Sequence, residues 1–192
     1  MCYLWCGGNE GGNSVAEVLS GKVSPSGKLP DTIPVKLEDH PATKNFGNKI
    51  QNYYQEDIYV GYRYFETFAP EKVMYEFGFG LSYTTFDIET VSSKYENGII
   101  TLDVKVTNTA SQYSGKEVVQ IYYSAPQGKL GKPLKQLIAF QKTNTLKPNE
   151  NQNLTFEFNE NQMSSYDDSN ITGNKSCYVL EEGEYNIFVG TS

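Results

Sequence analysis

The sequence predicts a mainly β protein, an immunoglobulin-like two-sheet β-sandwich preceded by a short α/β fragment and an extended linker. Aromatic residues make up 14% of the 192 residues, with 15 Tyr and 10 Phe, and such residues favour half-buried pleated surfaces. From residue 85 onward, short alternating runs recur at the spacing of a sandwich. The length is enough for one complete domain and part of another.

The first 21 residues predict a strand, a turn and a helix. MCYLWC is a continuous apolar run, typical of a buried parallel strand. A glycine-rich turn follows, and Ser14 with Glu17 matches a capping box that opens a short helix over residues 15–20, closed by Gly21. Because a chain seldom starts inside a core strand, we expect this unit to be the end of a larger α/β domain.

The next part of the sequence predicts an extended and irregular chain. Residues 23–34 contain three prolines and a glycine, which oppose a helix. Residues 36–53 are polar and show no sustained period, which indicates a surface excursion.

Seven strands are expected after this linker. Residues 100–106 alternate so that Ile100, Leu102, Val104 and Val106 share one face, and residues 185, 187 and 189 do the same in the last run, with Phe188 on the other face. Turn signals such as Asn97-Gly98 separate the runs. The seven runs are residues 85–95, 99–108, 116–124, 134–143, 153–159, 176–182 and 184–190.

Charge and composition exclude several classes of function. A net charge of −7 argues against binding to a phosphate backbone and is compatible with a neutral substrate, so no nucleic-acid partner is expected. The apolar runs are far shorter than the roughly 20 residues of a membrane span, and no signal-peptide pattern is visible, so we expect a soluble protein with no membrane partner. Cys2, Cys6 and Cys177 cannot all pair, which favours a reducing compartment such as the bacterial cytoplasm.

Neither a metal site nor a bound cofactor is expected. The chain has a single histidine, His40, and the cysteine spacing does not fit a CxxC pair. The glycine-rich turn lacks both GxGxxG and the P-loop ending, so close packing of strand and helix is its better interpretation. With His40 as the one candidate base, a hydrolytic triad is not expected either.

Two long stretches resemble glycoside hydrolase family 3. Residues 10–34, EGGNSVAEVLSGKVSPSGKLPDTIP, are similar to the family segment that closes an α/β sandwich domain. Residues 54–86, YQEDIYVGYRYFETFAPEKVMYEFGFGLSYTTF, are similar to the family segment that leads into a fibronectin type III-like domain. The resemblance implies three parts: residues 1–45 as the end of the sandwich domain, 46–83 as a joining segment, and 84–192 as the fibronectin type III-like β-sandwich.

The resemblance also implies an activity for a longer parent protein. Enzymes of this family remove terminal β-linked sugars, as β-glucosidases or β-xylosidases, by a retaining mechanism with two carboxylates. The family's catalytic Asp lies on a (β/α)8 barrel and its acid/base Glu on the sandwich domain, and neither motif is present here. We therefore expect an inactive fragment that supports the enzyme and packs on a missing barrel. Asp57 and residues 165–192 resemble members in which the barrel follows these domains.

Five residues are candidates for supporting roles, and none is expected to be catalytic. Glu10 lies in a turn at the carboxyl end of the first predicted strand, where α/β sheets place their sites, so it is a candidate for the active-site rim. Tyr62, Arg63, Phe77 and Phe79 are candidates for interdomain contacts, an interpretation that we favour over a sugar-stacking platform.

Two alternatives stay open at this point. The carboxylates of the joining segment, expected to face solvent or pair with Arg63, could include an acid/base group; they are Glu56, Asp57, Glu66, Glu71 and Glu76. A free-standing carbohydrate-binding or adhesion module on the same sandwich is the alternative function, and it would need a row of exposed aromatic side chains.

Overall fold

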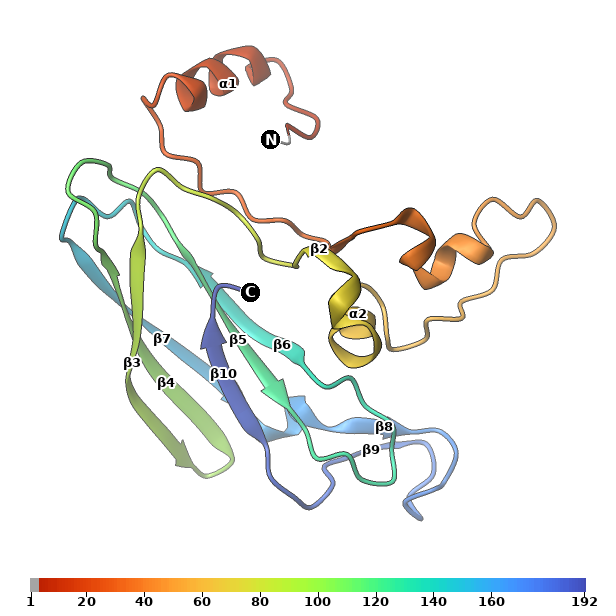
Figure 1. Cartoon of the computed structure of the whole chain (residues 1–192). Coiled ribbons are helices and arrows are strands. Elements are labelled where there is room, and N and C mark those ends of the chain that lie inside the picture. Colours follow the sequence, from red (N-terminus) through yellow and green to blue (C-terminus); the bar gives the residue numbers. More distant parts are fainter. Residues whose placement is uncertain (1–3) are drawn as a thin grey trace.

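The computed structural model describes residues 4–192 and contains two antiparallel three-stranded sheets that face each other (Figure 1). The mainly β architecture predicted from the sequence is therefore confirmed. One sheet has the order β3-β4-β7, formed by Phe86–Glu96, Ile99–Asn108 and Asn151–Asn159. The other has the order β10-β5-β6, formed by Asn186–Gly190, Val118–Ser124 and Gln136–Lys142.

The hydrophobic core lies between these two sheets. The expected alternation in β4 is confirmed, because Leu102, Val104 and Val106 are buried while Asp103 points outward and accepts hydrogen bonds from Ser92 and Thr155. Alternate residues of β5 and β7 supply most of the rest of the core, and Tyr185, Ile187 and Val189 pack against it. The core buries Val119, Ile121, Tyr123, Leu154, Phe156 and Phe158.

The predicted turn between β3 and β4 is present. Asn97 and Gly98 have φ values of 52° and 78°, the left-handed conformations of a tight hairpin turn whose twist matches the flanking strands. Phe86 pairs with Asn108 and Glu96 with Ile99 at the two ends of this hairpin.

The sixth predicted strand is not part of the sandwich. Its residues form β9, Cys177–Val179, which pairs with β8, Ser165–Asp167, in a separate two-stranded ribbon. Neither β8 nor the preceding 3-10 helix η4, Glu160–Met163, was predicted from the sequence. Short strands of this kind carry too few alternating positions to reveal their partner.

The N-terminal prediction is partly wrong. The helix α1 spans Gly11–Leu19, so Ser14 lies inside it and donates its backbone N-H to the Glu10 carbonyl, at 3.0 Å, instead of capping the helix. Residues 4–6 are exposed and form no strand, whereas residues 1–3 of the predicted strand lie outside the described residues. A parallel strand needs neighbouring strands for its hydrogen bonds, and the described chain provides none at this position.

The linker is extended, as predicted, with a few short elements. The strand β1, Ile33–Pro34, pairs with β2, Val73–Tyr75. The helix α2, Tyr62–Phe68, was not predicted, and it lies beside the sheet that contains β5 and β6 (Figure 1). Three 3-10 helices complete the segment: η1, Leu37–Asp39, η2, Pro41–Lys44, and η3, Pro70–Lys72. Within residues 4–192, no helix has the length and apolar character of a membrane span.

Candidate functional site: the joint between linker and sandwich

Three segments far apart in the sequence meet at one joint: residues 26–32, residues 75–80 and β5. The Leu29 N-H donates to the Phe79 carbonyl at 2.9 Å, and the Gly78 N-H donates to the Leu29 carbonyl at 2.8 Å. These two bonds hold the proline-rich chain against the FGFG stretch as a short backbone ladder. The ladder joins two stretches of the linker, and one of them lies against the sandwich where Gly78 meets Gln120 of β5.

Gly78 makes the closest approach in the joint. Its φ is +88°, and a Cβ atom built there would lie 2.3 Å from Gln120 Nε2 and 2.6 Å from the Thr191 carbonyl oxygen. Gln120 itself donates to that carbonyl at 2.6 Å, so neither group is free to withdraw. Glycine is required here both by backbone conformation and by space.

A buried ion pair crosses the joint. Lys28 Nζ lies 2.7 Å from Glu117 Oε1, and the two side chains are only 14% and 11% exposed. Lys28 also donates to the Gly80 carbonyl at 3.3 Å, while the Glu117 N-H donates to Thr143 Oγ1 at 3.0 Å. Removing one partner of such a pair leaves a charge without compensation in a poorly solvated place. The pair therefore fixes the relative position of the two segments.

The aromatic side chains of α2 and the FGFG stretch cover the outer face of β5. The Tyr62 ring stacks on Phe77, with centroids 4.9 Å apart, and meets the edge of Tyr122 at 5.9 Å. The Tyr62 hydroxyl accepts the Leu137 N-H at 2.8 Å. Phe79 packs instead on Tyr75, at 5.0 Å. Tyr62, Phe77 and Phe79 are thus arranged as packing groups inside this joint.

A small cavity lies beneath these rings. Its volume is about 10 Å³, and its lining includes Glu66, Glu76 and Tyr122. Burial raises the pKa of the Tyr122 hydroxyl, and the hydroxyl donates to Gln120 Oε1 at 2.7 Å. Two carboxylates face this cavity, but sites for small ligands are larger by more than an order of magnitude, roughly 300 to 1,000 Å³. A sugar ring cannot enter.

Within residues 4–192 Arg63 makes no ion pair, although the carboxylates of the joining segment were expected either to face solvent or to pair with it. Its Nη1 donates to the Ile58 carbonyl at 3.2 Å, and its guanidinium carbon lies 5.9 Å from the centroid of the Tyr62 ring. Glu66 lies 3.7 Å from Lys135 Nζ. Residues at i and i+3 of a helix can interact, so α2 would allow Arg63 to reach Glu66, but Glu66 faces Lys135 of the chain before β6 instead.

Glu10 is exposed at the N-terminal end of α1, where its Oε2 accepts a hydrogen bond from Asn13 Nδ2 at 2.6 Å. Its role at an active-site rim stays a prediction.

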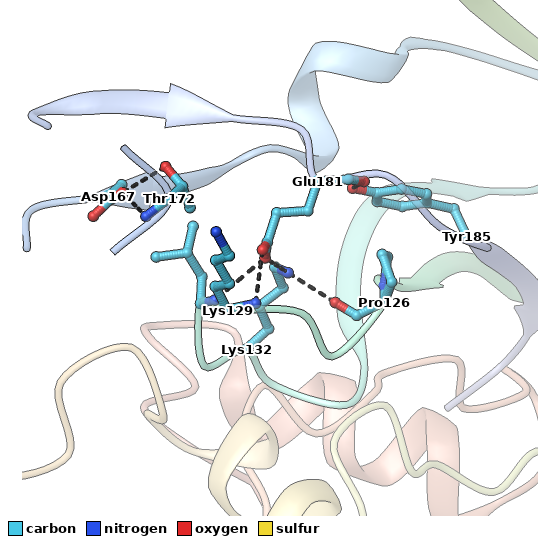
Figure 2. A network of polar contacts seen from close by, with 8 residues as sticks. Pro126, Lys129, Lys132, Asp167, Thr172, Glu181 and Tyr185 are labelled. Atoms are coloured by element: carbon cyan, nitrogen blue, oxygen red, sulfur yellow. Dashed lines mark hydrogen bonds and ion pairs between the residues drawn. The ribbon is translucent and has the colours of Figure 1, made fainter. Parts of the chain in front are cut away.

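A second buried ion pair was not predicted from the sequence (Figure 2). Lys132, whose side chain is 1% exposed, donates to Glu181 and to the Pro126 carbonyl at 2.7 Å. Glu181 also accepts the Lys129 N-H at 2.7 Å and the Leu130 N-H at 3.3 Å. Burial pushes the pKa of Glu181 up, but these donors outweigh it and hold the pKa below its usual range. The pair ties the β5–β6 loop to the chain after β9.

Asp167 organises the loop between β8 and β9. Its buried carboxylate accepts the Thr172 hydroxyl at 2.6 Å and the Thr172 N-H at 2.9 Å (Figure 2). It also accepts the Asn170 N-H at 2.7 Å. The Thr172 hydroxyl is the main cause that holds the pKa of Asp167 well below its usual range. Nothing local in the sequence marks Asp167, Lys28 or Lys132 as buried, because their partners lie on other segments or depend on the loop conformation.

Two family models match this chain, one over its N-terminal part and one over the sandwich. Residues 2–83 match the Glycosyl hydrolase family 3 C-terminal domain, and residues 117–192 match the Fibronectin type III-like domain. Fold and joint together define a class, a fibronectin type III-like sandwich locked onto the end of a glycosidase C-terminal domain. The chain belongs to glycosyl hydrolase family 3.

The similar proteins are much longer than this chain. A beta-glucosidase of Ruminococcus albus is 51% identical over 191 residues, which are 100% of this chain and 20% of that protein. A beta-glucosidase of Kluyveromyces marxianus is 42% identical over 193 residues, which are 22% of that protein. The crystal structure of a beta-glucosidase from Paenibacillus barengoltzii aligns with 95% of this chain and 20% of its own, at 55% identity and a TM-score of 0.92. The chain thus spans about a fifth of these relatives.

Proposed function

We propose that this chain is the non-catalytic supporting part of a family 3 β-glucosidase-type enzyme. The parent enzyme hydrolyses terminal β-linked sugars by a retaining mechanism with two carboxylates, and both carboxylates lie in other parts of it. The observation that carries the proposal is the joint itself, where a buried ion pair, Lys28–Glu117, and the Tyr62 and Phe77 rings lock the sandwich to the linker. Such a joint gives a rigid brace rather than a flexible tether.

An apolar surface on the linker supports this proposal. Ile50 and Tyr54 are 96% and 90% exposed, and Phe46, Ile58, Val60 and Phe68 are exposed nearby. Soluble domains seldom leave so many large apolar side chains uncovered along one segment. Because the relatives are about five times longer than this chain, the rest of the enzyme is the natural cover for this surface. We assign this linker surface to contact with the catalytic barrel.

The division into residues 1–45, 46–83 and 84–192 belongs to the same proposal. So do the interdomain roles of Tyr62, Arg63, Phe77 and Phe79, and the position of Glu10 at the rim of the active site. We also propose that the barrel follows residue 192, as in the members with the reversed domain order. A free-standing carbohydrate-binding module is not favoured, because the similarity extends through the linker as well as the sandwich.

Hydrolysis of p-nitrophenyl β-D-glucoside and β-D-xyloside tests the proposal directly. The 192-residue chain is compared with a longer protein that contains the sequence on both sides of it. We expect turnover by the longer protein and none by the chain. Turnover by the chain would disprove the proposal and would direct mutagenesis to Glu10, Glu56 and Asp57.

A pair of variants in the longer protein tests the linker surface. Ile50→Asp places a charge on the assigned contact, so we expect it to lower both the thermal midpoint and the activity. The matched control is Val91→Asp, which changes an exposed apolar residue of β3 in the sandwich. Equal effects of the two variants, or no effect of Ile50→Asp, would contradict the assignment.

A further inference from the structure

A second surface of the molecule has the character of a binding site. An open groove of about 420 Å³ runs between η4 and β9 and is lined by Asn161, Gln162, Ser164, Tyr178 and Leu180. Figure 1 shows the β8–β9 ribbon well away from α1. The volume of the groove falls within the usual range for sites of small molecules, roughly 300 to 1,000 Å³.

Hydrogen bonds on η4 fix the polar wall of the groove. The Asn161 N-H donates to the Asn159 side chain at 2.9 Å, and the Asn159 N-H donates to Gln162 Oε1, also at 2.9 Å. This reciprocal cap holds the Gln162 side chain by its oxygen, so that its NH₂ group remains available as a donor. The side-chain amide of Asn161 makes no hydrogen bond within residues 4–192, and it offers both a donor and an acceptor.

The aromatic wall is held from both ends. The Tyr178 ring packs against Tyr166 of the neighbouring strand, with centroids 5.2 Å apart and planes at 65°, and Tyr178 remains 74% exposed. Asp167 orders the loop that leads into β9, and Glu181 anchors the chain just after Leu180 (Figure 2). Because the Tyr178 ring is already held in one orientation, it should lose little conformational entropy when a ligand binds.

The lining chemistry selects the kind of ligand. None of the five lining residues carries a charge, so the groove favours a neutral ligand over an ionic one. An exposed tyrosine face suits the apolar C-H face of a pyranose ring, and amide and hydroxyl groups suit its ring hydroxyls, which both donate and accept. A long aliphatic ligand would leave these polar groups without partners.

We propose that this groove binds a pyranose unit of a neutral carbohydrate, stacked on Tyr178 and hydrogen-bonded to the amides of Asn161 and Gln162. The groove holds no carboxylate pair, so the site binds sugar without cleaving it. The inference stands apart from the supporting role proposed above, because binding at the ribbon needs neither the joint nor the catalytic domain.

Titration of the ¹⁵N-labelled 192-residue chain with cellobiose, a β-linked glucose disaccharide, tests the site. We expect saturable chemical-shift changes at Asn161, Gln162, Tyr178 and Leu180, with a Kd on the order of 1 mM for a shallow site. Tyr178→Ala weakens binding about tenfold by removing the ring face, whereas Tyr178→Phe keeps that face and the affinity. The matched control is Phe140→Ala, an exposed aromatic residue of β6, which leaves binding unchanged.

Three results would overturn the inference. The first is the absence of saturable shifts at about 50 mM cellobiose, where a site with a Kd of about 1 mM would be full. The second is a set of shifts that Tyr178→Ala does not alter. The third is a change at the groove that depends on protein concentration without sugar, because it would mark the groove as a contact between two copies of the chain.

Discussion

Replacement of Lys28 by methionine should destabilise the joint strongly. Methionine keeps most of the length of the side chain but removes its charge, so Glu117 would remain buried without its cation. Breaking a buried pair on one side costs about 3 to 5 kcal/mol. We expect the lower end, about 3 kcal/mol, because both side chains retain some solvent contact and Glu117 Oε1 still accepts the Val118 N-H.

Urea unfolding followed by circular dichroism measures this cost. With a slope of about 2 kcal/mol per M urea, a loss of about 3 kcal/mol lowers the midpoint by about 1.5 M. Hydrogen exchange at the Leu29 and Gly78 amides gives a local measurement, because both amides bond across the joint. Both amides should exchange faster in Lys28→Met even if the sandwich itself stays folded.

The matched control is Lys22→Met. Lys22 pairs with Glu17 at 2.5 Å, but the two side chains are 69% and 42% exposed, so the loss should stay below about 1 kcal/mol. Adding Glu117→Gln to Lys28→Met removes the orphaned charge and should restore part of the stability. If Lys28→Met costs no more than Lys22→Met, the ion pair does not hold the joint and the reasoning is wrong.

Three further predictions concern other buried contacts. Gly78→Ala should lower the free energy of unfolding by at least about 2 kcal/mol, because the new Cβ meets Gln120 and the Thr191 backbone. The matched control is Gly173→Ala, where φ is +90° but nothing lies within 4 Å of the new Cβ, so it should cost only the backbone strain of about 1 kcal/mol. Thermal unfolding of the two variants measures the difference. Lys132→Met should lower the free energy of unfolding by about 3 kcal/mol and loosen the β5–β6 loop. Equal amide hydrogen exchange of this loop in the variant and the wild-type chain would refute this prediction. The depressed pKa of Asp167 means that its contribution is complete above the ordinary carboxyl pKa of about 4 and disappears as the pH falls through the folded-state pKa. The protection factors of the β8–β9 loop amides, which correct for the slower intrinsic exchange in acid, should therefore fall at low pH, and Asp167→Asn should show the lower protection already at pH 7.

The local pattern of the sequence predicted the sandwich well. Strict alternation in residues 100–106, together with the Asn97-Gly98 turn, specifies which face of β4 is buried and where the chain reverses. The same approach failed for α2, because its aromatic residues occupy positions that serve a strand, a helix or a loop equally well. It also failed at Ser14, where a capping pattern occurs inside a helix that begins at Gly11.

The sequence by itself determined the class of fold, the family and the absence of the family's catalytic motifs from this chain, because these depend on short-range pattern and on long runs of similar residues. Only the tertiary structure decided which polar residues are buried and what they contact. Lys28 and Lys132 look like ordinary surface lysines in the sequence, yet each is held by a glutamate that lies 89 or 49 residues further along the chain. Burial and pairing of charges depend on which segments meet in space, and that is set by the packing of the whole chain.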